Sequence, residues 1–470
     1  MAAQIHHWQP EDPSFWGREG SRIARRNLAL SVPPLMLAFA VWMLWSVLVV
    51  ELPRVGYRFS TDQLFWLAAL PGLAGGTMRL FFAFLVPVLG GRTWTTVSTL
   101  LLGLPALGIG LALQDPDTSY PVFVLLAVLC GIGGGNFASS MANISLFYPS
   151  TRRGEALGWN AGLGNLGVSL VQLAVPLAIA FGMFGALGGA AQTWSDGQVS
   201  HPVWLQNAGF VWLPLILAAA AAAWLGMDDL TAWRLPFEQQ AVVFVRPDTW
   251  LLSWLYLGTF GSFIGFAAGF PLLARTEFGA TAPVGYAFVL PLLAALTRPL
   301  GGWLADRLGG ARITLTSFLG MAASVAALLA ASVAIERGAG YARFVALFAV
   351  LFVSSGLGNG ALFHMIPAAF ASQAMRRQGA SARKPAQALQ QGAIEGAGAL
   401  GFASAVAAFG GFFIPKSYGT SLALTGEASS ALGLFLVFYL SCIAVLWWRY
   451  LRRGSVAWID PHQHAPPSAR

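Results

Sequence analysis

Two arginines, Arg79 and Arg298, each lie in the middle of a long apolar stretch. Each precedes a pair of loop glycines by eleven residues, Gly90–Gly91 for the first and Gly309–Gly310 for the second. Eleven helical residues span about 16 Å, and half of a membrane's hydrocarbon core is about 15 Å. Both side chains are therefore expected to start near the centre of the bilayer. An isolated arginine costs several kcal/mol at that depth, so each needs a partner.

A structural ion pair would require a carboxylate at the same depth. All but one of the 19 Asp and Glu residues fall in predicted loops or at helix ends. The exception is Glu395, which we expect within about two turns of the cytoplasmic end of its span. Neither arginine therefore has an obvious permanent counter-ion, and the favoured interpretation is an anion site. A guanidinium presents two parallel N–H groups, which suit a flat anion with several oxygens.

The elements that would carry these arginines are membrane helices. The chain has 470 residues, of which 56% are hydrophobic and only 10% charged, well below the roughly 25% charged residues of a soluble domain. Hydropathy over about 19 residues predicts twelve spans near 28–50, 63–88, 93–113, 120–147, 155–181, 203–226, 249–273, 283–304, 312–334, 341–370, 386–413 and 429–451. The fold class is therefore an all-α membrane protein.

The basic residues indicate the orientation of these helices. With the N-terminus in the cytoplasm, 19 of the 27 Lys and Arg residues fall in cytoplasmic segments and 6 in outside loops. This positive-inside bias places both termini in the cytoplasm of a multi-pass inner-membrane protein. It also explains the net charge of +8 without nucleic acid as a partner. Membrane lipid is the expected surrounding, and we expect a monomer.

The chain is predicted to divide into two pseudo-symmetric six-helix halves. The predicted parts are a cytoplasmic segment 1–27, a first half 28–226, a cytoplasmic linker 227–248, a second half 249–451 and a cytoplasmic tail 452–470. Three echoes in the same order support a duplication: the arginine-to-glycine spacing, Gly131–Gly135 with Gly356–Gly360, and Gly164–Gly167 with Gly398–Gly401. Such repeats predict a transport site between the halves.

Glycines concentrate in four of the predicted spans. The candidates for close helix packing, which would also let helices slide during gating, are Gly131, Gly133, Gly134, Gly135, Gly162, Gly164, Gly167, Gly356, Gly358, Gly360, Gly396, Gly398 and Gly401. Small residues let membrane helices approach closely. No nucleophile–base pair or metal cluster is visible, and the two cysteines lie in apolar runs. We therefore expect no enzyme activity, no cofactor and no metal.

One loop resembles the signature of the major facilitator superfamily, G-x-x-x-D-R-x-G-x-x-R. It begins at Gly302 and contains Asp306, Arg307 and Arg312, while the matching loop of the first half has Pro87 in place of the aspartate. We expect the aspartate to cap or pair across a helix end and the arginines to stay at the inner surface.

A second resemblance names a family within that superfamily. The run Gly131-Ile-Gly-Gly-Gly-Asn-Phe-Ala-Ser-Ser-Met-Ala-Asn-Ile-Ser145 resembles the nitrate signature of the nitrate/nitrite porter (NarK-type) family. Weaker similarity extends over nearly the whole chain, including Ala38–Met43, Tyr256–Phe263 and Gly410–Lys416. The resemblance implies a twelve-helix facilitator that exchanges nitrate and nitrite across the inner membrane, in a context such as nitrate assimilation.

The same resemblance implies roles for individual residues. Arg79 and Arg298 would bind the substrate. The other implied contacts are polar ones from Asn165 and Tyr256, an aromatic sandwich of Phe137 and Phe260 around the flat anion, and an apolar lining of Phe39 and Met43.

Two alternatives to exchange remain open. Nitrate–proton symport would need a titrating group in the pathway, and the candidates are Glu395 and His364, the latter standing where relatives would carry glutamine. A sensor that binds anion without transport is the other, although such proteins usually carry an added signalling domain. Dependence of uptake on a proton gradient separates symport from exchange.

Overall fold

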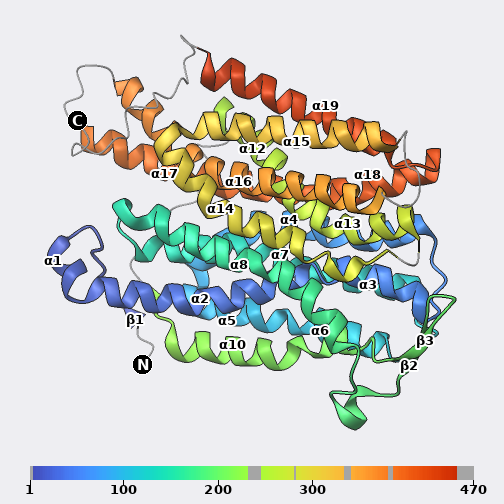
Figure 1. The fold of residues 1–470 in the computed structure, drawn as a ribbon. Helices are drawn as coiled ribbons and strands as arrows, with labels where there is room; N and C mark the ends of the chain where they lie inside the picture. Colours follow the sequence, from blue (N-terminus) through green and yellow to red (C-terminus); the bar gives the residue numbers. More distant parts are fainter. Residues whose placement is uncertain (1–3, 231–244, 280–281, 333–339, 379–384, 453–470) are drawn as a thin grey trace. The chain divides into compact units, whose positions relative to one another are not determined.

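The computed structural model describes residues 4–230, 245–279, 282–332, 340–378 and 385–452, and helices dominate them (Figure 1). Within these ranges, twelve helical segments are long and apolar enough to cross a membrane. Each overlaps one of the predicted spans, so the predicted all-α membrane architecture is confirmed. The first helical segment begins earlier than predicted, at Pro13, because the polar residues before the first span are helical as well.

The chain packs into two compact units. Unit 1 comprises Met1–Arg234, Ile264–Leu292 and Ala408–Ala428, and unit 2 comprises Leu235–Phe263, Leu293–Ala407 and Ser429–Arg470. The predicted division into halves at a linker stays a prediction. Residues 231–244 of that linker and 453–470 of the predicted tail lie outside the described residues.

Unit 1 holds the first six spans and three helical elements from later in the chain. Its elements are β1 (Gln4–Ile5), α1 (Pro13–Phe15), η1 (Trp16–Gly20), α2 (Ser21–Trp42), α3 (Trp45–Glu51), η2 (Leu52–Val55), α4 (Thr61–Leu89), α5 (Gly91–Leu101), α6 (Gly103–Ala112), α7 (Tyr120–Phe147), α8 (Ser150–Ala178), η3 (Gly185–Gly188), β2 (Gln192–Ser195), β3 (Ser200–Val203), α9 (Asn207–Phe210), α10 (Trp212–Gly226), β4 (Asp229–Leu230), most of α13 (Ser262–Phe278), η6 (Val284–Tyr286) and α18 (Gly410–Thr425).

The described elements of unit 2 are all helices. These elements are α12 (Pro247–Tyr256), η5 (Leu257–Gly261), most of α14 (Val289–Leu308), α15 (Gly310–Ser332), α16 (Gly340–Gln378), most of α17 (Pro385–Ala408), α19 (Ser429–Leu446) and η7 (Trp447–Leu451).

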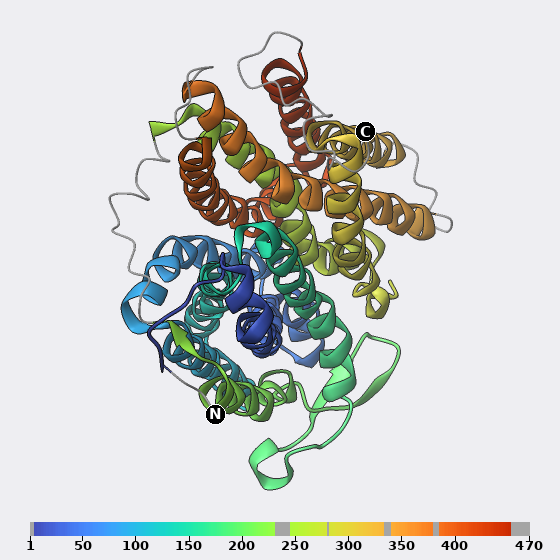
Figure 2. The same ribbon diagram turned by 90° about the vertical axis from the view of Figure 1, so that its left-hand side faces the viewer.

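Helix α2 lies at the centre of unit 1, with other helices of that unit around it (Figure 2). Glycines allow this close packing. A Cβ atom on Gly133 of α7 would collide with the carbonyl oxygen of Ala38 in α2, and one on Gly167 of α8 would collide with that of Met36. Three helices therefore meet backbone to backbone around the buried end of α2.

The repeat predicted from the sequence has a structural counterpart in the two loop glycines. Gly90 ends α4 with φ 87°, and Gly309 follows α14 with φ 93°. The backbone N–H of Gly90 donates to the carbonyl oxygen of Val86, and that of Gly309 donates to the carbonyl oxygen of Ala305. Glycine adopts this left-handed conformation without the penalty that a side chain would incur. Both arginine-bearing helices thus end in the same way, eleven residues after the arginine.

Two short sheets were not predicted, and both belong to unit 1. Strand β1 pairs in parallel with β4, and β2 and β3 form an antiparallel hairpin in the loop before α9. The hairpin is pinned by Trp194, whose indole N–H donates to Glu51 and whose ring lies under the Arg54 guanidinium. These strands have two to four residues each, too few for an alternating pattern to stand out.

Candidate functional site

Arg79 is held inside unit 1 by backbone and aromatic contacts. It lies on α4, which begins at a capping box formed by Ser60 and Gln63, and its side chain is 1% exposed. Its Nε–H donates to the carbonyl oxygen of Gly134 on α7 at 2.7 Å. The guanidinium carbon lies 4.5 Å from the ring centre of Phe137 and 5.0 Å from that of Trp42. Cation–π attraction to two rings fixes the plane of the guanidinium.

Glycines explain how the Gly134 carbonyl reaches Arg79. A Cβ on Gly134 would lie 2.6 Å from the Cα of Gly75, so only a glycine lets α7 approach α4 this closely. Phe39 of α2 completes the aromatic group, because its ring meets that of Phe137 edge-on at 6.0 Å. Unit 1 thus brings together Arg79, Phe137 and Phe39, three of the predicted site residues.

The other two predicted residues of unit 1 are also buried. Met43 follows the last residue of α2 and is 2% exposed, and Asn165 on α8 is 1% exposed. The amide oxygen of Asn165 has no hydrogen-bond partner within the described part of the chain. A buried unpaired oxygen costs about 1–3 kcal/mol, so the polar group at this position is not explained by helix packing.

Arg298 occupies the corresponding place in unit 2. It lies on α14, is 3% exposed, and its guanidinium carbon is 5.1 Å from the ring centre of Phe363 on α16. The Tyr256 side chain lies near enough to interact with it. Among the described residues, Nη1 and Nη2 of Arg298 are buried and make no hydrogen bond of sound geometry, and no carboxylate forms an ion pair with this side chain.

Tyr256 and Phe260 stack on each other in unit 2. Their rings lie 5.7 Å apart at 20°, and both side chains are fully buried. Phe260 lies in η5, a single π-helical turn, a feature that often marks functional sites. The hydroxyl of Ser355 on α16 donates to the Thr259 carbonyl at 2.9 Å, which ties this turn to the helix that carries Phe363.

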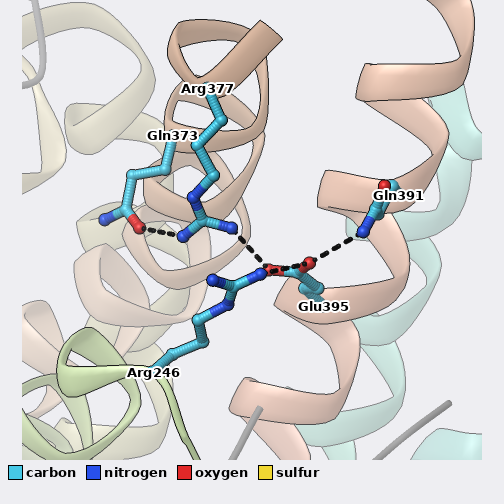
Figure 3. A network of polar contacts seen from close by, with 5 residues as sticks. All are labelled: Arg246, Gln373, Arg377, Gln391 and Glu395. Carbon is cyan, nitrogen blue, oxygen red and sulfur yellow. Dashed lines mark hydrogen bonds and ion pairs between the residues drawn. The ribbon is translucent and has the colours of Figure 1, made fainter. Parts of the chain in front are cut away.

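Glu395 lies in a separate polar network of unit 2 (Figure 3). Its carboxylate is 4% exposed and forms ion pairs of 3.2 Å with Arg246 and with Arg377. Gln391 donates to the same carboxylate, and Gln373 accepts a bond from Arg377. Both oxygens of Glu395 are thus engaged by two arginines from other helix ends. This arrangement is typical of a structural contact between α16 and α17, and not of a residue that carries protons.

We expect Glu395→Gln to destabilise the protein without abolishing transport. The substitution leaves two partly buried arginines short of a charge, and a charge-assisted hydrogen bond is worth about 1.5–3 kcal/mol. The melting temperature in detergent should fall by several degrees, while anion flux and its independence of a pH gradient are retained. Gln391→Ala, which removes a weaker bond to the same carboxylate, should cause a smaller decrease. Loss of flux in Glu395→Gln at wild-type stability would contradict this assignment.

The second candidate proton carrier also has a partner. His364 Nδ1 lies 3.0 Å from an Asp306 oxygen, which links α16 to the last turns of α14. The aspartate of the loop signature thus contacts the neighbouring helix α16. Arg307 is exposed with its guanidinium 3.9 Å from the Trp303 ring centre, and Arg312 is exposed as well.

The glycines differ in what surrounds them. A Cβ would collide with a neighbouring helix at most of the predicted positions, namely Gly131, Gly133, Gly134, Gly135, Gly164, Gly167, Gly356, Gly358, Gly360 and Gly396. At Gly162 and Gly401 it would meet nothing within 4 Å, so close packing does not explain these two.

Three contacts of the arginines were not predicted from the sequence: Trp42, Phe363 and the Gly134 carbonyl. Trp42 and Phe363 are single aromatic residues in a chain with 18 Trp and 33 Phe. Their only signal was proximity to recognised motifs, since Trp42 lies between Phe39 and Met43. A backbone carbonyl leaves no signal in the sequence.

Comparison with known proteins shows similarity over the full length. The family profile described as Major Facilitator Superfamily matches residues 34–383. "Nitrate/nitrite transporter NarU" of Salmonella typhimurium is 46% identical over 449 residues, with 96% of each chain covered. "Probable nitrate/nitrite antiporter NarK2" of Thermus thermophilus is 40% identical over 462 residues, covering 96% of this chain and 97% of the relative.

A solved structure is similar in fold. The crystal structure of a D-xylose-proton symporter superposes with a TM-score of 0.62 at 15% identity, covering 90% of this chain and 97% of the other. At this identity the likeness concerns the fold alone. It confirms the predicted twelve-helix facilitator fold.

Proposed function

Because the chain belongs to the nitrate/nitrite transporter (NarK-type) family of the Major Facilitator Superfamily, we propose that it exchanges nitrate for nitrite across the inner membrane by alternating access. The chain is a multi-pass membrane transporter rather than an enzyme. In the proposed orientation both termini face the cytoplasm, as the positive-inside bias predicts.

The observation that most supports anion transport is the burial of the Arg298 guanidinium without an ion-pair partner among the described residues. A buried guanidinium whose two terminal nitrogens make no hydrogen bond of sound geometry to a described residue is costly in a membrane protein unless something else supplies negative charge. A flat oxyanion can accept both N–H groups in parallel. Nitrate and nitrite are both flat, monovalent and oxygen-bearing, so one arrangement of donors can accept either.

The proposed anion contacts are those that the family resemblance implies. Arg79 and Arg298 would both bind the anion, with Asn165 and Tyr256 as further polar contacts. The apolar and aromatic residues Phe137, Phe260, Phe39 and Met43 would enclose it, the two phenylalanines stacking on its faces. Two sets of contacts support this proposal: Arg79 lies over the Phe137 ring, which meets Phe39 edge-on, and Tyr256, which is near Arg298, stacks on Phe260.

Exchange follows from the charge of the site. With no anion bound, closing the protein would bury two positive charges that repel each other, which is strongly unfavourable in a low dielectric. A bound anion neutralises part of that charge, so the loaded protein can switch between its inward-facing and outward-facing conformations. The return movement then also requires an anion, which makes transport an exchange.

Proton symport is the second candidate, and the structure gives it little support. Glu395 is engaged by two arginines, and His364 lies beside Asp306. Neither residue contacts Arg298 through any bond among the described residues.

The test is nitrate uptake into proteoliposomes that contain the purified full-length protein. Vesicles loaded with nitrite should take up labelled nitrate at least about tenfold faster than vesicles free of exchangeable anions, because the empty carrier returns slowly. A proton gradient should not replace internal nitrite. Equal uptake into anion-free vesicles would contradict exchange, uptake driven by a proton gradient would establish symport, and binding without flux would indicate a sensor.

A further inference from the structure

We propose that Trp42 is a positioning residue, which orients the Arg79 guanidinium for the anion without touching the anion itself. This inference deepens the proposed function and rests on it. Three observations support it: the hydrogen bond of the Trp42 indole, the glycines that surround its ring, and the ring face that lies against Arg79.

Trp42 is anchored at its polar edge. It is the last residue of α2 and has no exposed surface. Its indole N–H donates to the Pro71 carbonyl on α4 at 2.7 Å. A buried indole N–H needs such a partner, and this one uses the only donor of the side chain. No polar group of Trp42 is left to bind an anion.

Three glycines make room for the ring. A Cβ on Gly75 would lie 2.5 Å from the indole nitrogen, one on Gly134 would lie 2.7 Å from the ring carbon Cε2, and one on Gly133 would lie 3.1 Å from the Trp42 Cβ. Two of these glycines belong to the run that resembles the nitrate signature. That run therefore serves to seat Trp42 as well as to bring the helices together.

The face of the anchored ring is directed at Arg79. The guanidinium carbon lies 5.0 Å from its centre, while Phe137 and the Gly134 carbonyl hold the same guanidinium from other directions. Since the Gly134 bond engages Nε, these contacts fix the plane in which the terminal N–H groups lie. A flat anion needs that plane to be fixed, because both of its hydrogen bonds must form together.

The direct test compares nitrate exchange in proteoliposomes for Trp42→Leu with that for Trp45→Leu. Trp45 is a matched control, being equally buried one turn further on but packed edge-on against Phe123. Loss of the ring face should raise the KM for nitrate about tenfold in Trp42→Leu and change the maximal rate little. Trp45→Leu should change stability but not KM. Equal KM values for the two variants would overturn the inference.

A second measurement avoids the risk that Trp42→Leu does not fold. Progressively fluorinated tryptophans, incorporated at position 42 alone, weaken the negative face of the ring with little change in size. The KM for nitrate should rise with each added fluorine, and a constant KM would overturn the inference. If the unsubstituted protein shows no exchange at all, the proposed function fails and this inference with it. If exchange is present and the fluorine series is flat, only the role of Trp42 fails.

Discussion

Replacing Arg298 by lysine is expected to reduce nitrate exchange by about 10- to 100-fold while the protein stays folded. A lysine keeps the positive charge but cannot present two parallel N–H groups. Loss of one charge-assisted hydrogen bond costs about 1.5–3 kcal/mol, and each 1.4 kcal/mol is tenfold in affinity. Arg79→Lys should have an effect of the same order, and it also disturbs the bond to Gly134.

The flux of both variants is measured in proteoliposomes loaded with nitrite, after their melting temperatures have been compared with that of the wild type. Arg58→Lys is the matched control, because Arg58 is an exposed arginine between the first two spans. It should leave flux unchanged. Wild-type flux in Arg298→Lys would show that binding of the anion by two parallel N–H groups is not needed.

Gly360→Ala is expected to produce the second large effect, a loss of more than about tenfold in exchange together with a lower melting temperature. A Cβ at this position would collide with the carbonyl oxygen of Arg298 and lie 2.8 Å from the Gly302 nitrogen. Both atoms are backbone and cannot turn aside, so α16 must move away from α14 at the level of the arginine. Overpacking of this kind typically costs about 1–3 kcal/mol.

Gly401→Ala provides the control for helix propensity and for added volume. Nothing lies within 4 Å of a Cβ at that position, and alanine favours a helix over glycine by about 1 kcal/mol. We expect this variant to melt no earlier than the wild type and to transport normally. Similar losses in Gly401→Ala and Gly360→Ala would mean that glycine flexibility, and not close packing beside Arg298, is what matters.

The membrane helices were predictable because lipid imposes a simple rule. Each span must be long, apolar and internally hydrogen-bonded, so hydropathy located the twelve spans found among the described residues. The two buried arginines were predictable for the complementary reason, since a charge in an apolar run is conspicuous. Phe39, Phe137, Tyr256 and Phe260 came only from family resemblance, because nothing in composition or spacing distinguishes them from other aromatic residues.

Contacts between distant parts of the chain could not be predicted. Arg246 lies 149 residues from Glu395, and only the folded helix ends bring them together. The sequence singled out Glu395 as an acidic residue inside a span but could not show that two arginines hold it. Trp42 and Phe363 were missed for the same reason, because a ring that faces a guanidinium is defined by packing between helices and not by a motif.

The most direct test of the central claim is equilibrium binding of nitrate to the purified, detergent-solubilised protein, measured for the wild type, Arg79→Lys, Arg298→Lys and the double variant. We predict saturable binding to the wild type, binding weakened by at least about tenfold in each single variant, and no detectable binding in the double variant. Wild-type affinity in the double variant would show that nitrate binds elsewhere, and the two-arginine site would have to be abandoned.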